Sequence, residues 1–97
     1  MPRDRLGIVW DDANRRHLSE DHPERNLTIP EIEQAMNDPK RLQSSEVRDG
    51  LPHFAIVGST KEQRILVVVW IGRGRRRYPI HAHPAGRKEV QEYWRDI

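Results

Sequence analysis

Residues 64–71 read RILVVVWI and contain the longest apolar run of the chain. β-Branched types dominate this run, and both faces of an extended strand would be apolar, which is typical of the interior of a sheet. We therefore predict that residues 64–71 form the central strand. Glycines 72 and 74 predict a hairpin connection to a strand over residues 76–83, and residues 59–62 predict the loop from a strand over residues 53–58.

Two further strands and three helices complete the prediction. Asp11 is a good N-cap for a helix over residues 12–21, and Thr28 with Glu31 matches a capping box for a two-turn helix that stops before Pro39. The remaining elements are a short strand at 6–10, a polar edge strand at 41–48 followed by a turn at 50–52, and a last helix at 87–96. This order predicts an α+β fold, with two N-terminal helices and one C-terminal helix packed on a mainly antiparallel sheet.

Side-chain alternation along residues 76–83 assigns two faces to the last strand. One face carries Tyr78, Ile80 and Ala82, and the other carries Arg77, Pro79, His81 and His83. Because proline has no backbone N–H, Pro79 predicts a bulge or an edge position in this strand.

Length and composition restrict the class of protein. The chain has 97 residues, which predicts a single domain over residues 1–97. Charged residues make up 33%, and the longest apolar run is far below the ~18 residues that a membrane-spanning helix needs, so we expect no membrane contact. Cysteine is absent and the N-terminus shows no secretory pattern. We therefore expect a cytoplasmic protein.

Charge is unevenly distributed along the chain. Residues 11–46 carry five basic and nine acidic side chains, whereas residues 47–97 carry ten basic and five acidic ones. Four of the arginines lie within residues 73–77. This basic half suits phosphate binding, and a solvated, arginine-rich hairpin turn explains it equally well.

An ordered set of short motifs runs through the chain. It comprises Trp10-Asp11, a helix running to His22, a capped helix ending at Asp38-Pro39, Ile56-Val57-Gly58, the strand at 64–69, and a last helix with Glu89 and Tyr93. In this order the motifs resemble the BrnT family of ribonuclease toxins from type II toxin–antitoxin systems, over residues 8–94. The resemblance implies a RelE-like fold.

The same resemblance implies a function and a partner. The protein would cleave RNA to arrest growth, and a small antitoxin, usually a ribbon–helix–helix DNA-binding protein, would neutralise it in a hetero-oligomer. Three positions depart from the family pattern: Pro23 stands where glycine is usual, and His53 and His83 stand where arginines are usual. The glutamate that usually precedes the first of these arginines is also missing.

Ribonuclease chemistry without a metal needs a base, an acid and a cation that stabilises the phosphorane. Histidine titrates near neutral pH and arginine clamps phosphate, so both residue types fit this task. We predict His81, His83, His22 and Arg64 as catalytic residues, with Arg64 opening the central strand beside the last one. The predicted RNA-binding residues are Arg77, Arg76, Arg75, Arg73 and Lys88.

Other interpretations of these residues stay open. His22 would also suit the C-terminal end of a helix dipole, and Arg64 would also suit an ion pair with an acid. His81-x-His83 has metal-ligand spacing, with His22, His53 or Glu89 as a third ligand, but no further motif supports a metal, so we expect no cofactor. The alternative function is a catalytically degenerate module that binds nucleic acid or a protein partner. A structural or regulatory protein without nucleic-acid contact is a third option.

Overall fold

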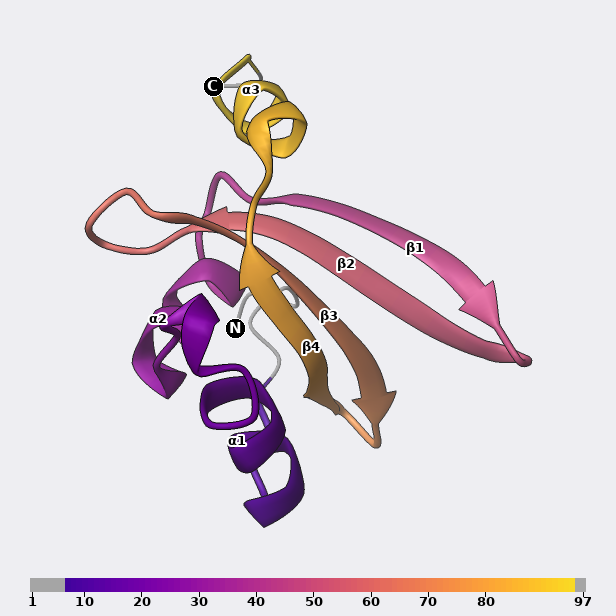
Figure 1. The fold of residues 1–97 in the computed structure, drawn as a ribbon. Coiled ribbons are helices and arrows are strands. Elements are labelled where there is room, and N and C mark those ends of the chain that lie inside the picture. Colours follow the sequence, from indigo (N-terminus) through magenta and orange to yellow (C-terminus); the bar gives the residue numbers. More distant parts are fainter. Residues whose placement is uncertain (1–6, 96–97) are drawn as a thin grey trace.

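The computed structural model describes residues 7–95. Its elements, in chain order, are α1 (Asp12–Ser19), the one-turn 3-10 helix η1 (Pro23–Arg25), α2 (Ile29–Met36), β1 (Leu42–Arg48), β2 (Leu51–Ser59), β3 (Ile65–Arg73), β4 (Arg76–Pro84) and α3 (Arg87–Arg95). The strands form one antiparallel sheet in the order β1-β2-β3-β4. Figure 1 shows α1 and α2 together beside the sheet, and α3 apart from them beyond the end of β4. The predicted α+β fold and the interior position of β3 are confirmed.

The hydrophobic core lies between the first two helices and one face of the sheet. Ile32 and Met36 of α2 are fully buried against Ile56 of β2 and Leu66 and Val68 of β3. The packing is closest where Gly58 meets the α2 backbone, because a Cβ at Gly58 would lie only 2.1 Å from the carbonyl oxygen of Ala35. Both predicted helix starts are confirmed, since Asp11 caps α1 and Thr28 forms the capping box of α2.

The turn between β1 and β2 lies slightly earlier than predicted. Asp49 and Gly50 both have positive φ, 52° and 76°, and form a two-residue hairpin turn, so Leu51 and Pro52 already belong to β2. The turn between β3 and β4, by contrast, lies later and is tighter than the predicted 72–74, because β3 continues to Arg73 and β4 begins at Arg76. At the last helix, Asp96 of the predicted range lies outside the described residues.

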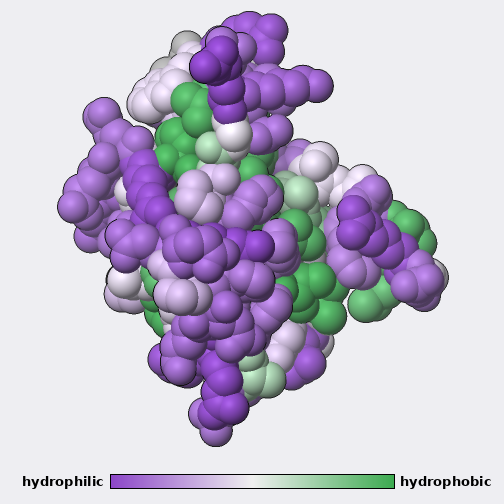
Figure 2. Space-filling model, viewed as in Figure 1, coloured by the Kyte–Doolittle hydropathy of each residue, from purple (hydrophilic) through white to green (hydrophobic). Residues whose placement is uncertain are grey.

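The predicted edge position of β1 is confirmed, and this edge is open. All of its residues after Leu42 are exposed. Val47 is 70% exposed, and Leu51 at the start of β2 is 42% exposed. The hydrophobic surface at the right of Figure 2 lies over the end of this β1–β2 hairpin.

The opposite edge strand, β4, contains a bulge. Val69 of β3 pairs with His81, but the next residue, Trp70, pairs with Pro79, so Ile80 is an extra residue without a partner. A bulge shifts the alternation of side chains by one residue. The predicted irregularity at Pro79 is therefore confirmed, and it divides β4 into two parts with opposite alternation.

This bulge overturns the predicted faces of β4. Arg77 and Pro79 lie on the buried face together with Ala82, and Arg77 is only 2% exposed. His81 and His83 flank Ala82 and lie on the opposite face. The prediction that Arg77 shares a face with the two histidines is wrong, because the alternation was counted through Pro79 without the extra residue.

The first half of the free β4 edge is covered by the N-terminal segment. Val9 donates its backbone N–H to the carbonyl of Arg77 at 2.8 Å, and the N–H of Arg77 donates to the carbonyl of Gly7 at 2.7 Å. The strand predicted at 6–10 is thus reduced to a single parallel bridge at Ile8, and Leu6 lies outside the described residues.

Side chains cover the second half of this edge. The Asn14 amide donates to the carbonyl of Pro79 at 3.1 Å and to the carbonyl of Val9 at 3.0 Å. The Arg25 guanidinium donates to the carbonyl of Ala82 at 3.1 Å. Exposed edge carbonyls invite pairing with other chains, so these contacts both satisfy β4 and fix α1 and η1 beside it.

No helix within residues 7–95 is long and apolar enough to cross a membrane.

The Gly58 contact predicts a large, local stability effect. Gly58→Ala places a methyl group against the Ala35 carbonyl and should lower the free energy of unfolding by about 3 kcal/mol or more, because β2 and α2 cannot separate without opening the core. Gly72→Ala is the matched control, since a Cβ there meets nothing within 4 Å. Urea denaturation measures both, and equal stability of the two variants would contradict this packing.

Candidate functional site

Four of the five histidines gather at the free edge of β4. His17 lies in the last turn of α1 and His22 just before η1, and their ring centroids are 5.6 Å apart. His81 and His83 follow the bulge in β4, with ring centroids 5.1 Å apart. The two pairs are brought to the same edge by Arg25, three residues after His22, whose guanidinium donates to the carbonyl of Ala82 between His81 and His83. We call these four residues, with Arg25, the histidine cluster.

Arg25 is linked to both β4 histidines, by a hydrogen bond to the strand between them and by its positive charge. Its guanidinium bonds to the carbonyl of Ala82, the residue between His81 and His83. Its charge acts on both of those imidazoles. The sequence analysis missed Arg25 and His17 as site residues. The one feature of the sequence that could have indicated them is their closeness to His22, since His17 precedes it by five residues and Arg25 follows it by three.

Burial keeps the β4 imidazoles uncharged near neutral pH. Burial lowers the pKa of His81, and positive charge on His83, Arg25, His17 and His22 lowers it further. The pKa of His83 is lowered by burial and by Arg25, against an opposing effect of the Glu89 carboxylate. The Nδ1 atom of His83 is buried and lacks a hydrogen-bond partner among residues 7–95. Neutral imidazoles of this kind can accept a proton from a substrate.

The other two histidines have carboxylates as neighbours. His17 Nδ1 lies 3.4 Å from Asp21, and His22 Nδ1 lies 3.4 Å from Glu24. A carboxylate beside an imidazole holds the ring in one orientation. The cluster therefore combines two half-buried rings whose pKa values are lowered with two rings that each have a carboxylate neighbour.

Arg64 contacts the backbone that carries Arg25 and does not contact the histidines of the cluster. Its guanidinium donates to the backbone carbonyls of Arg25 and Asn26, both at 2.6 Å, and to the Glu31 carboxylate at 3.2 Å. Asn26 has a positive φ of 51°, so Arg64 holds the turn that presents Arg25. The ion pair with an acid, considered from the sequence, is present. These contacts make Arg64 a positioning residue for Arg25.

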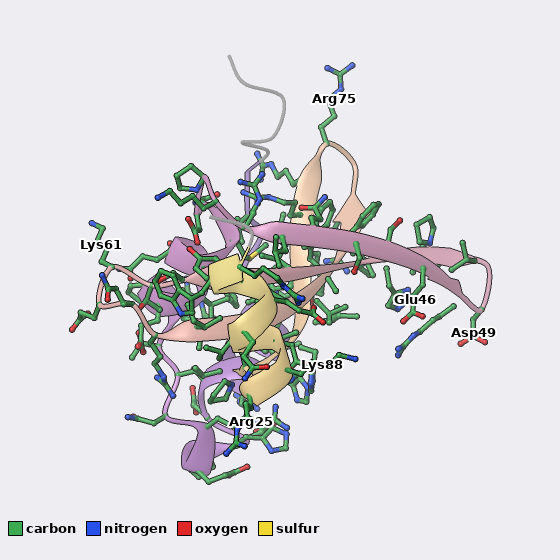
Figure 3. The ribbon with its side chains drawn as sticks, turned by 90° about the horizontal axis from the view of Figure 1, so that it is seen from above. Arg25, Glu46, Asp49, Lys61, Arg75 and Lys88 are labelled. Atoms are coloured by element: carbon green, nitrogen blue, oxygen red, sulfur yellow. The ribbon has the colours of Figure 1, made fainter. Side chains whose placement is uncertain are left out.

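The predicted RNA-binding arginines do not lie together with the histidine cluster. Arg77 is buried and donates to the carbonyl of Met36 and to Asn37 at the end of α2. Arg73 stacks on Tyr78, with 3.8 Å from its guanidinium carbon to the ring centroid. Figure 3 shows Arg75 at the opposite end of the view from Arg25, and Lys88 nearer to Arg25.

The separation of the hairpin from the cluster follows from strand geometry. Arg76 precedes His81 by five residues, which is about 17 Å along an extended strand. The exposed cations Arg73, Arg75 and Arg76 therefore form a separate basic patch at the tip of the β3–β4 hairpin.

The histidine cluster does not have the geometry of a metal site. Within the described part of the chain, no group of three or more His, Cys, Asp or Glu side chains is arranged to hold a metal ion. Acid–base and electrostatic chemistry are what the side chains present can do.

The cluster predicts that stability depends on pH. Because the pKa values of His81 and His83 are lowered below 6.5 in the folded chain, the unfolded chain binds more protons as pH falls below that value. The free energy of unfolding should therefore decrease as pH drops from about 7.5 to 5. His81→Gln with His83→Gln should flatten this dependence in urea titrations. An unchanged slope in the double variant would contradict the arrangement.

Comparison with known proteins found no protein-family model and no curated protein that matches this chain. The α+β fold and the position of each side chain thus come from the structure itself. The resemblance to ribonuclease toxins rests on the motifs alone, and it enters below as a proposal.

Proposed function

We propose that this protein is an endoribonuclease that cleaves RNA by acid–base chemistry without a metal, as the toxin of a type II toxin–antitoxin system. One observation carries the catalytic part: four of the five histidines and an arginine converge from α1, η1 and β4 on one edge of the sheet.

The side chains divide the reaction between them. His83, kept neutral by burial, takes the proton of a ribose 2′-OH, and the resulting oxyanion attacks the adjacent phosphorus. His22, beside Glu24, returns a proton to the departing 5′-oxygen, which leaves a 2′,3′-cyclic phosphate and a 5′-OH. Arg25 stabilises the phosphorane charge with the N–H groups that Ala82 leaves unused. His81, which burial also keeps uncharged, lines the site together with His17, and Arg64 positions Arg25.

The toxin part of the proposal rests on the motif resemblance to the BrnT family and its RelE-like fold. It includes a cytoplasmic site of action and a small antitoxin as partner, of the ribbon–helix–helix type, in a hetero-oligomer. The separate basic patch of Arg73, Arg75 and Arg76 is the surface that we assign to RNA outside the reaction centre.

A binding module without catalysis is the second candidate function. One observation favours it. Arg64 and Arg77 were predicted to take part in phosphate stabilisation or RNA binding, but their guanidinium groups donate hydrogen bonds to backbone carbonyls and side chains of the fold. In that case the cluster would bind phosphate and leave it intact.

Cleavage of a labelled RNA in EDTA tests the catalytic proposal. His83→Gln should lower the rate on the order of a hundredfold or more by removing the base, and Arg25→Gln should do the same by removing charge stabilisation. Arg25→Lys should retain part of the rate, and His53→Gln, outside the cluster, should cut like wild type. Full activity in His83→Gln, or cleavage only with added metal, would contradict the catalytic proposal and favour the binding module.

Growth of cells that express the chain tests the biological part. Expression of wild type should slow growth, His83→Gln should not, and co-expression of an adjacent small gene should restore growth. Unimpaired growth with abundant, folded wild-type protein would contradict the toxin role.

A further inference from the structure

A second concave surface lies away from the histidine cluster. A cleft of about 660 Å³ opens between α2, the loop from β2 to β3, and the end of α3. The residues that define its chemistry are Glu33, Asp38, Lys40, Lys61, Tyr93 and Trp94. The mechanism above uses none of them.

The two carboxylates of this cleft accept hydrogen bonds from other groups of the fold. Asp38 accepts hydrogen bonds from the Tyr93 hydroxyl, from the backbone N–H of Ser59 at 2.8 Å and from that of Lys40 at 2.9 Å. Burial works to raise the pKa of Asp38, but these bonds bring it below its usual value. Glu33 accepts a bond from the Trp10 indole at 2.8 Å. Asp38 is therefore engaged through both of its oxygens, whereas Glu33 accepts through Oε2.

The basic and aromatic groups of the cleft, by contrast, are accessible. Lys40 and Lys61 are exposed, and no ion pair involves either ammonium group within residues 7–95. Figure 3 shows Lys61 extending outward from the β2–β3 loop. Trp94 is 46% exposed, and its ring is held edge-on by the buried Tyr93, with centroids 5.1 Å apart. The cleft therefore presents two ammonium groups and one exposed aromatic ring beside the Asp38 and Glu33 carboxylates.

We propose that this cleft binds a nucleotide of single-stranded RNA, with the base stacked on Trp94 and the flanking phosphates at Lys40 and Lys61. Stacking on an aromatic ring beside positive charges is the usual way to bind single strands without sequence readout. The lining of the cleft is more apolar than polar, with Pro30 and Pro39 beside Trp94, which would also suit a peptide partner. The two lysines without ion pairs among the described residues are what favours RNA over a peptide.

This inference rests on the proposed ribonuclease function, because it makes the cleft a subsite of the same RNA. α3 connects the two places: Glu89 acts on His83, and Trp94 follows five residues later on the same helix. Five residues span about 7.5 Å along a helix axis and turn through a net angle of about 140°, so Trp94 and Glu89 lie on different sides of α3. RNA that continues past the cleavage point would therefore pass around this helix to reach Trp94.

Binding of an RNA that cannot be cleaved tests the subsite independently of catalysis. The probe is a fluorescent 2′-O-methyl oligouridine of eight nucleotides, measured by anisotropy. Trp94→Ala should weaken binding about tenfold, and Trp94→Phe should recover most of the loss. Removing Lys40 and Lys61 together should reduce the slope of log affinity against log salt by about 1.4, at about 0.7 per phosphate contact. Arg15→Ala, an exposed cation on α1, should leave the affinity nearly unchanged.

Two outcomes would overturn the proposal. One is an RNA affinity that Trp94→Ala leaves unchanged while the variant keeps the circular dichroism of the native fold. The other is that Trp94→Ala weakens binding of a protein partner but not of RNA, which would make the cleft a protein-binding site. Cleavage of a dinucleotide by wild type reports separately on the ribonuclease function, because that substrate is too short to span both places. A Trp94-dependent affinity without any cleavage would keep the subsite and remove the proposed catalysis.

Discussion

The free edge of β4 is the constraint on which the rest of the structure depends. Its outward carbonyls must find donors, and they find them in Val9, Asn14 and Arg25. Asn14 serves twice, since its backbone N–H and side chain also complete the cap of α1 with Asp11. The contacts that seal the sheet therefore dock α1 and η1 at that edge, and docking is what brings His17 and His22 to the β4 histidines.

The bulge at Ile80 determines what this edge presents. Without the extra residue, Arg77 would share a face with His81. With it, Arg77 turns inward and holds the C-terminal end of α2 through Met36 and Asn37. Arg64 is similarly committed to the turn at Asn26. Arg64 and Arg77 therefore have structural roles, and Arg25 is the arginine that faces the histidines.

Local patterns predicted much of the fold. The apolar run at 65–71, the two helix caps and the polar edge strand are short-range signals, and each formed the predicted element. The direction of side chains in β4 needed the location of one extra residue, which depends on pairing with Trp70 and not on β4 alone. Arg25 escaped prediction for a related reason, because its hydrogen-bond partner, Ala82, is 57 residues away in sequence. His81, His83 and His22 were predicted from residue type, and the structure places them in one cluster.

The histidine cluster is the central claim, and NMR titration of its imidazoles tests it most directly. In wild type, His81 should titrate with a pKa below 6.5, since it is buried beside Arg25 and three other histidines. Arg25→Gln should raise that pKa toward 6.5, because the neighbouring positive charge is removed. A His81 pKa that does not respond to Arg25→Gln would show that the edge of β4 does not bring these groups together.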